Sequence, residues 1–337
     1  MRYVNAYRAA VCFRSLSTCL LYPYPSTSSK VHETVEGGND KLVAIFLHDN
    51  FARPMKNGGA WMSDYRCQTR NFASLKLAGK EERVLLRGGD CTVPIIVNNN
   101  NFAKGAEGEP TLLSFDDART LFHEFGHGLH GMLSDVTYSR LSGTSVLKDF
   151  VELPSQLYEH WLSEPAVLKK HARHYRTGAT IPDELLQKLF DARNFNLGFD
   201  TIEYTICALM DQSLHQIGTA EELEKLDINA FEKSELKRFE MPDGIVMRHR
   251  PSHFAHLFSG SSYAAGYYVY LWAEVLDADG FGAFKETGNC FDADVAARAR
   301  KFIYSSGNSV DPMEAYKNFR GREPEVEPML RKKGLMV

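Results

Sequence analysis

SFDDARTLFHEFGHGLHGMLS, the stretch Ser114–Ser134, has the pattern of an amphipathic helix. Ser114 is a residue type that favours the N-cap position. Asp116 and Asp117 follow in the first turn, where the positive end of the helix dipole favours negative charge. Apolar side chains then recur at helical spacing, at Phe122, Phe125, Leu129 and Met132. The sequence therefore predicts one helix over the whole stretch.

A second set of side chains on this helix has the spacing of a metal site. With about 3.6 residues per turn, His123 and His127 lie one turn apart on the same face, within reach of one Zn²⁺. Glu124 is rotated roughly 100° from His123, so it can flank the metal without binding it and accept a proton from water. We predict that the two histidines are ligands and that Glu124 is the general base.

A third ligand is needed, because His-Glu-x-x-His also arises by chance on amphipathic helices. The segment DFVELPSQ, residues 149–156, sets Glu152 in an apolar frame just before a helical pattern. Two histidines and a glutamate leave the fourth tetrahedral position of zinc open for water, as in catalytic zinc sites. Glu152 is therefore the predicted third ligand, and Pro154 either starts or kinks the helix that follows.

Two further features of this region leave alternatives open. Glu159 lies two turns beyond Glu152, where it can accept the free N–H of a ligand histidine or be a solvated surface carboxylate. Gly126 and Gly128 each disfavour a helix by about 0.5–1 kcal/mol relative to alanine. They indicate that backbone or substrate approaches the helix closely there.

These motifs resemble the thimet oligopeptidase and peptidyl-dipeptidase family of zinc metallopeptidases. The resemblance extends from about Phe51 to Leu335, and its signatures are FHEFGHGLH at 122–130, SRLSGTS at 139–145 and DFVELPSQ at 149–156. It includes GGAWM at 58–62, NFNLGF at 194–199 and YAAGYYVYLW at 263–272. It implies a zincin-type catalytic domain that holds one Zn²⁺ per chain and hydrolyses bonds in short peptides. We therefore expect an unresembling N-terminal segment at 1–40 and the catalytic domain at 41–337.

A run of tyrosines also bears on chemistry. Tyr263, Tyr267 and Tyr270 fall at i, i+4 and i+7, on one face of a predicted helix that follows His256. From spacing alone, a tyrosine face of this kind is more often part of an ordinary amphipathic helix, and a histidine such as His256 more often has a structural role. The resemblance implies that all four line the substrate cleft, with His256, Tyr267 and Tyr270 catalytic and with Tyr263, His256 and Tyr267 binding substrate. Tyr270 ranks first as the oxyanion donor, whereas the resemblance does not extend to His253 and Tyr268.

The residues around this run indicate a branch of the family. The longer loop after His256 and the segment Ala264-Ala-Gly266 resemble peptidyl-dipeptidases, which implies release of C-terminal dipeptides; internal cleavage is the other activity in the family. Arginines could receive the substrate carboxylate or be surface residues; they are Arg248, Arg250, Arg320 and Arg322. Family members also carry a long helical N-terminal segment that we do not find here. A shortened protein that binds zinc and peptides but turns over poorly is therefore the alternative function.

Composition excludes several other classes of protein. The net charge is −4 with no basic block, so neither nucleic acid nor an anionic membrane is an expected partner, and the oligomeric state stays open. The six cysteines are scattered without a C-x-x-C pair, which predicts free thiols and a cytoplasmic protein. Residues 1–30 have four basic and no acidic side chains. This pattern is typical of a mitochondrial transit peptide, with a disordered N-terminus as the alternative.

The remaining patterns predict a mainly α fold with a small mixed β-sheet. Short β-branched or leucine-rich runs predict strands at 42–46, 83–86 and 93–97. Asn98–Asn101 then predicts a turn. Helical periodicity recurs at 153–174, 182–192, 201–217, 220–239, 262–277 and 295–305. An extended peptide could add to the edge of such a sheet as a further strand.

Overall fold

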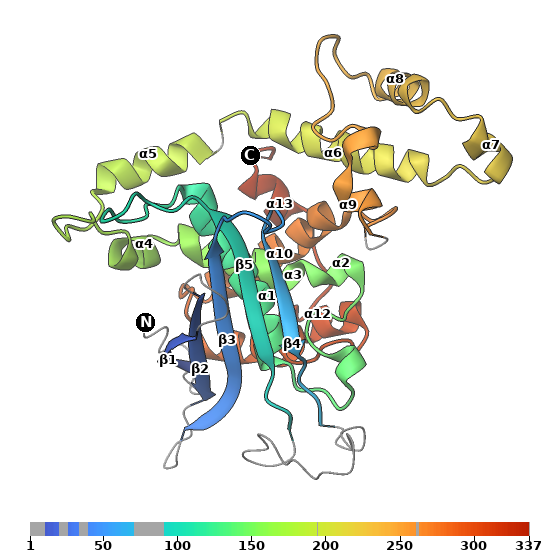
Figure 1. The fold of residues 1–337 in the computed structure, drawn as a ribbon. Coiled ribbons are helices and arrows are strands. Elements are labelled where there is room, and N and C mark those ends of the chain that lie inside the picture. Colours follow the sequence, from blue (N-terminus) through green and yellow to red (C-terminus); the bar gives the residue numbers. More distant parts are fainter. Residues whose placement is uncertain are drawn as a thin grey trace. The chain divides into compact units, whose positions relative to one another are not determined.

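The computed structural model describes residues 11–19, 26–33, 40–70, 91–193, 195–260 and 263–336 (Figure 1). For residues 11–19, 26 and 27 it describes the backbone alone. The predicted strand at 83–86 lies outside the described residues. The chain divides into two compact units. The first unit comprises Met1–Leu147, Leu153–Ile181 and Asp277–Pro324. The second comprises Lys148–Glu152, Pro182–Leu276 and Glu325–Val337.

A five-stranded mixed sheet forms one layer of the first unit. Its strands, in the order β1-β2-β3-β5-β4, are Val11–Cys19, Ser26–Glu33, Lys41–Phe51, Ile95–Phe102 and Trp61–Arg66. β3 and β5 run parallel, and the other neighbours are antiparallel. The predictions of a small mixed sheet and of strands at 42–46 and near 93–97 are thus confirmed. β1, β2 and β4 were not predicted, and β1 and β2 lie within the N-terminal segment 1–40.

The predicted turn at Asn98–Asn101 is wrong, because these residues continue β5. Asn98 and Asn100 are buried on one face of the strand. Asn100 Nδ2 donates to Oδ1 of Asn50 at 3.0 Å, and Asn101 Nδ2 donates to a loop carbonyl at 2.7 Å. Asparagine favours turns because its amide bonds nearby backbone. Here the same amides bond groups that are distant in the sequence, and the strand persists.

Helix α1, Phe115–Leu133, forms as predicted and lies across the sheet (Figure 1). It begins with a capping box, in which the Ser114 side chain accepts the Asp117 N–H and the Asp117 carboxylate accepts the Ser114 N–H. Three residues of its predicted apolar stripe pack around buried Phe46 and Ile96 of the sheet, with Met132 in the core and Phe125 and Leu129 at its edge. The fourth, Phe122, stacks on Tyr158 of α3 (Leu153–Glu159). The helix is therefore fixed at its start by hydrogen bonds and along its length by burial.

Gly126 and Gly128 of α1 allow the close approach that the sequence indicated. A Cβ at Gly126 would lie 2.6 Å from Cα of Ser155 and 2.7 Å from the carbonyl oxygen of Pro154, so α1 touches the backbone of α3. A Cβ at Gly128 would lie 3.2 Å from the Phe46 ring. α1 is thus pressed between the sheet and α3, with backbone against backbone at Gly126.

The other helices correct several predicted boundaries. The predicted helix at 153–174 is broken into three pieces, 220–239 restarts at the N-cap Asp227, and 262–277 begins only at Val269. The last predicted helix, 295–305, ends in a π-helical turn, Arg300–Tyr304. The remaining α-helices are α2 Lys148–Val151, α4 Pro165–His171, α5 Asp183–Arg193, α6 Leu197–Leu214, α7 Ala220–Glu224, α8 Ile228–Arg238, α9 Ala255–Phe258, α10 Val269–Glu286, α11 Ala293–Ala299, α12 Pro312–Arg320 and α13 Glu327–Lys332. Short 3₁₀ turns occur at Ser139–Leu141, His160–Ser163 and Pro251–His253.

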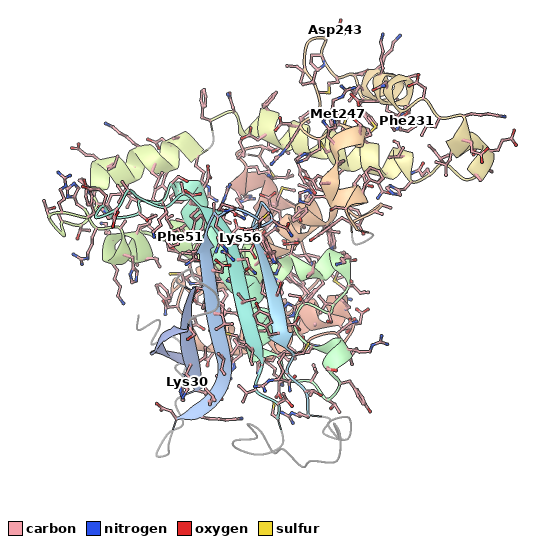
Figure 2. All side chains as sticks on the ribbon, viewed as in Figure 1. Lys30, Phe51, Lys56, Phe231, Asp243 and Met247 are labelled. Atoms are coloured by element: carbon pink, nitrogen blue, oxygen red, sulfur yellow. The ribbon has the colours of Figure 1, made fainter. Side chains whose placement is uncertain are left out.

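The second unit has its own apolar core around α6. Buried Ile206, Cys207 and Met210 of α6 pack with Met247 and Tyr267, and partly buried Phe231 joins from α8. Figure 2 labels Phe231 and Met247, which come from different parts of this unit. No helix in the described part of the chain is long and apolar enough to cross a membrane. The four cysteines with described side chains are free, as predicted.

Candidate active site

The predicted metal ligands come together. His123 and His127 project from α1, and Glu152 lies in the break between α2 and α3, where Pro154 is the second residue of the new helix. The candidate ligand atoms of His123, His127 and Glu152 all lie within 4.8 Å of one another. Tetrahedral ligand atoms about 2.0–2.2 Å from a common zinc ion lie roughly 3.3–3.6 Å apart. The three residues therefore supply the donor set for such an ion, and their ligand atoms have to draw together by up to roughly 1.4 Å to bind it.

Glu159 contacts one of the candidate ligands. At the end of α3, its Oε1 lies 2.7 Å from Nδ1 of His123. With Nδ1 bonded to a carboxylate, the imidazole presents Nε2 as its free donor atom, and its ring orientation is fixed. Of the two interpretations of Glu159 left open by the sequence, contact with a ligand histidine agrees with this geometry.

Glu124 lies next to His123 on α1, and its side chain is secluded. Only 5% of the residue is exposed, although it carries a carboxyl group. Burial keeps bulk water from the group, which suits a base that exchanges its proton with one substrate water. The general-base role of Glu124 stays a prediction, with which this burial is compatible.

The tyrosines gather, but not by the predicted helical geometry. Residues 263–268 form turns, and only Tyr270 of the three lies in α10. The Tyr263 and Tyr270 rings stack with centroids 5.6 Å apart, and the ring of His256 lies 6.0 Å from that of Tyr263. The Tyr263 hydroxyl donates to Oε1 of Glu152 at 2.9 Å. Tyr263 therefore contacts a candidate metal ligand, a role that its position in the sequence did not indicate.

The environments of the other two tyrosines differ. Burial raises the pKa of the Tyr270 phenol, and the Glu152 carboxylate and Tyr263 add to the rise, so Tyr270 is a neutral hydrogen-bond donor. Tyr267 is only 5% exposed and packs in the core of the second unit, and burial raises its pKa to about 12. The Tyr267 ring therefore belongs to this core, and the partly buried Tyr270 packs against it.

His256 is adapted to the neutral form. Desolvation lowers the pKa of its imidazole, and the Arg248 guanidinium lowers it further against a smaller opposing effect of Glu152. A neutral imidazole can still donate one hydrogen bond to a substrate. His253 and Tyr268, which the sequence left as structural residues, are exposed.

Three of the four candidate arginines are already engaged. Arg320 and Arg322 both bond the buried Asp279, at 3.3 Å and 2.5 Å. Arg250 bonds Glu232 at 2.8 Å. Arg248 is exposed, and its positive charge acts to lower the pKa of His256 and of Tyr267.

Sequence reasoning missed the contribution of α6. Tyr204, Asp211 and Gln212 all bond the backbone of the turn that carries Tyr263 and Tyr267. The one sequence signal was weak: Asp211 follows the apolar run Cys207–Met210, and an acidic residue in such a frame is seldom buried without a partner.

Comparison with known proteins places this geometry in a family context. The model of Peptidase family M3 matches residues 27–335. Over 297 residues the chain is 42% identical to dipeptidyl carboxypeptidase from Escherichia coli (strain K12), covering 88% of this chain and 40% of that protein. It is 37% identical to oligopeptidase A from Haemophilus influenzae over 300 residues, covering 88% of this chain and 41% of that protein. The chain thus spans about two fifths of the length of these relatives. Among solved structures, an M32 carboxypeptidase from Deinococcus radiodurans R1 matches with a TM-score of 0.48 and 17% identity, over 71% of this chain and 50% of that one.

Proposed function

The chain belongs to Peptidase family M3, and from that premise we propose that it hydrolyses peptide bonds in short peptides with the help of one Zn²⁺. One observation carries the proposal. The candidate ligand atoms of His123, His127 and Glu152 lie within 4.8 Å of one another. The two histidines share helix α1, whereas Glu152 comes from a later segment, between α2 and α3. This donor set leaves a fourth position open, as hydrolytic zinc sites require.

When bound, the metal ion supplies Lewis-acid polarisation of the scissile carbonyl and lowers the pKa of water. Glu124 takes the proton from the attacking water and passes it to the leaving amine. Glu159 holds the His123 ring through Nδ1, and the Tyr263 hydroxyl holds the Glu152 carboxylate. Tyr270 donates its phenolic hydrogen bond to the developing oxyanion, and His256 assists in binding substrate and stabilising that charge. The Tyr267 ring packs in the core of the second unit, so we assign it a supporting role.

We also propose that the substrate is cleaved two residues from its C-terminus. The name of the Escherichia coli relative, dipeptidyl carboxypeptidase, supports this reading, as does the exposed Arg248 near His256. A guanidinium can receive a terminal carboxylate in bidentate geometry. Peptides with a free C-terminus should therefore be cleaved, and the same peptides with an amidated C-terminus should be cleaved much more slowly.

Metal analysis joined to peptide cleavage tests the proposal. Purified protein should contain about one zinc per chain and should cleave a quenched fluorescent peptide. Glu152→Ala should lose most of the zinc and the activity, whereas Glu184→Ala, an exposed glutamate on α5, should lose neither. Full zinc occupancy in Glu152→Ala would show that the ligand assignment is wrong. Zinc without turnover in the parent would favour a peptide-binding protein with little hydrolysis.

A further inference from the structure

The turn Tyr263–Tyr268 adopts a backbone conformation that it does not favour by itself. Ala265 has a φ of 54°, in the left-handed region that residues other than glycine seldom occupy. Within the turn, the Gly266 N–H donates to the Tyr263 carbonyl at 2.8 Å. A conformation of this kind persists when the surrounding structure fixes it. The contacts that fix this turn come from α6.

Helix α6 bonds the polar backbone groups of two turn residues. Asp211 accepts the Ala265 N–H on Oδ1 and the Tyr267 N–H on Oδ2, each at 2.9 Å. Gln212 Nε2 donates to the Ala265 carbonyl at 2.6 Å, and the Tyr204 hydroxyl donates to the Tyr267 carbonyl. Both the N–H and the C=O of Ala265 and of Tyr267 are thereby bonded by one helix.

The Asp211 carboxylate holds the turn from a buried position, which has an energetic cost. Asp211 is fully buried, with 0% of the residue exposed. Burying a carboxylate is unfavourable unless hydrogen bonds compensate for its lost hydration, and apolar residues in such places are often as stabilising. Asp211 is compensated by the two N–H groups and by Nδ1 of His215, which lies 2.8 Å from Oδ1. A paired acceptor of this kind specifies one turn geometry, which an apolar side chain could not do.

The position of this turn fixes the tyrosines. It carries Tyr263 and Tyr267 and leads directly into α10, where Tyr270 is the second residue. Tyr263 in turn bonds Oε1 of Glu152 at 2.9 Å and stacks on Tyr270. A shift of the turn would therefore displace the phenol groups and the partner of a candidate metal ligand together.

We infer that Asp211 is a positioning residue for the proposed peptidase reaction: its two carboxylate oxygens clamp the amides of Ala265 and Tyr267 and thereby set the tyrosines in place. This inference rests on the proposed function. Asp211 touches neither substrate nor metal in this scheme, and it acts through Tyr263, Tyr267 and Tyr270.

Asp211→Asn is the sharpest test, since it keeps the shape but turns an NH₂ group toward one of the two N–H donors. We expect kcat to fall on the order of 10²-fold, the effect of a small misplacement of catalytic groups, with KM and zinc content nearly unchanged. In the Tyr270→Phe background the same change should cost only a few-fold, because Asp211 acts through the tyrosines. Asp200→Asn, an exposed aspartate on the same helix, is the matched control and should be silent.

Hydrogen exchange supplies a readout that does not depend on activity. The amides of Ala265 and Tyr267 should exchange faster in Asp211→Asn than in the parent or in Asp200→Asn. Unchanged exchange would overturn the clamp even if the parent proved not to be a peptidase. Faster exchange with unchanged kcat would overturn the positioning role while leaving the proposed function intact. The same conclusion would follow if Asp211→Asn lowered kcat by the same factor in the parent and in the Tyr270→Phe variant. Should Asp211→Asn fail to fold, Gln212→Leu removes one bond to the same turn and should lower kcat a few-fold; an unaltered kcat there would overturn the inference.

Discussion

Helix α1 and the turn Tyr263–Tyr268 both carry side chains of the candidate active site, and they hold them by different means. α1 starts with its own capping box, continues with regular backbone hydrogen bonds and buries an apolar face on the sheet. The turn contains a left-handed alanine and receives its hydrogen bonds from α6. The helix is held by packing and the turn by polar contacts from a neighbour.

This difference separates what each region can tolerate. A regular helix keeps its side chains in register through many small local interactions, so a change at one side chain alters chemistry and leaves the backbone in place. The turn depends on few hydrogen bonds, and the loss of one partner leaves buried donors without acceptors at about 1–3 kcal/mol each. Substitutions on α1 should therefore separate chemistry from structure, whereas those around the turn should couple the two.

The largest expected effect is on α1, at Glu124. Glu124→Gln should lower kcat by roughly 10²–10⁴-fold while zinc stays bound, because an amide cannot take a proton from water. Steady-state cleavage and metal analysis on the same preparation measure both quantities. Glu184→Gln, an exposed change on α5, serves as the control. A Glu124→Gln protein as active as its parent would remove the general base from the scheme.

The next effect concerns the tyrosines. Tyr270→Phe should lower kcat and kcat/KM together by roughly 10²–10³-fold, as expected when one oxyanion donor is removed. Tyr267→Phe should do less, since that ring is packed in the core. Tyr268→Phe, in the same turn and 43% exposed, should be silent. Steady-state kinetics on the three variants measure these effects, and each variant is checked for zinc content and melting temperature. If kcat is unchanged in all of them, the tyrosines have no part in the mechanism.

The smallest effect tests the packing of α1 itself. Gly126→Ala places a Cβ against the α3 backbone and should lower the free energy of unfolding by about 1–3 kcal/mol. At Gly198 on α6, an added Cβ would have no heavy atom within 4 Å. Gly198→Ala should therefore raise the free energy of unfolding, by less than about 1 kcal/mol. Urea unfolding of the two variants measures the contrast. Equal effects would mean that α3 yields to the added methyl group.

The helix could be predicted because its determinants are local. Ser114, the first-turn aspartates and the apolar spacing all lie within the element, and α1 begins and ends within one residue of the predicted stretch. The close approach of neighbouring groups at Gly126 and Gly128 could also be predicted. Glycine disfavours a helix, so its presence there indicates a compensating gain from close packing. The break that carries Glu152 was left open, and the structure places Pro154 at the start of α3.

The turn could not be predicted because its determinants are distant. Tyr263, Tyr267 and Tyr270 have helical spacing, and the alanines between them favour a helix. What prevents one is a carboxylate 54 residues away, which takes the Ala265 amide. The asparagines of β5 illustrate the same limit: a residue type with a strong local preference adopts another structure when partners from elsewhere satisfy it.

The contact between His123 and Glu159 has a consequence for the order of events in folding. The two residues are only 36 positions apart, and the predicted ligands lie within that stretch, whereas Tyr204, Asp211 and the tyrosine turn come later in the chain. Closing a loop of this length has a modest entropic cost, and metal binding adds its free energy to folding. We hypothesise that the chain captures its metal before the tyrosines are in place. In refolding experiments a metal-dependent signal should then precede the tyrosine near-ultraviolet signal, and the reverse order would refute the hypothesis.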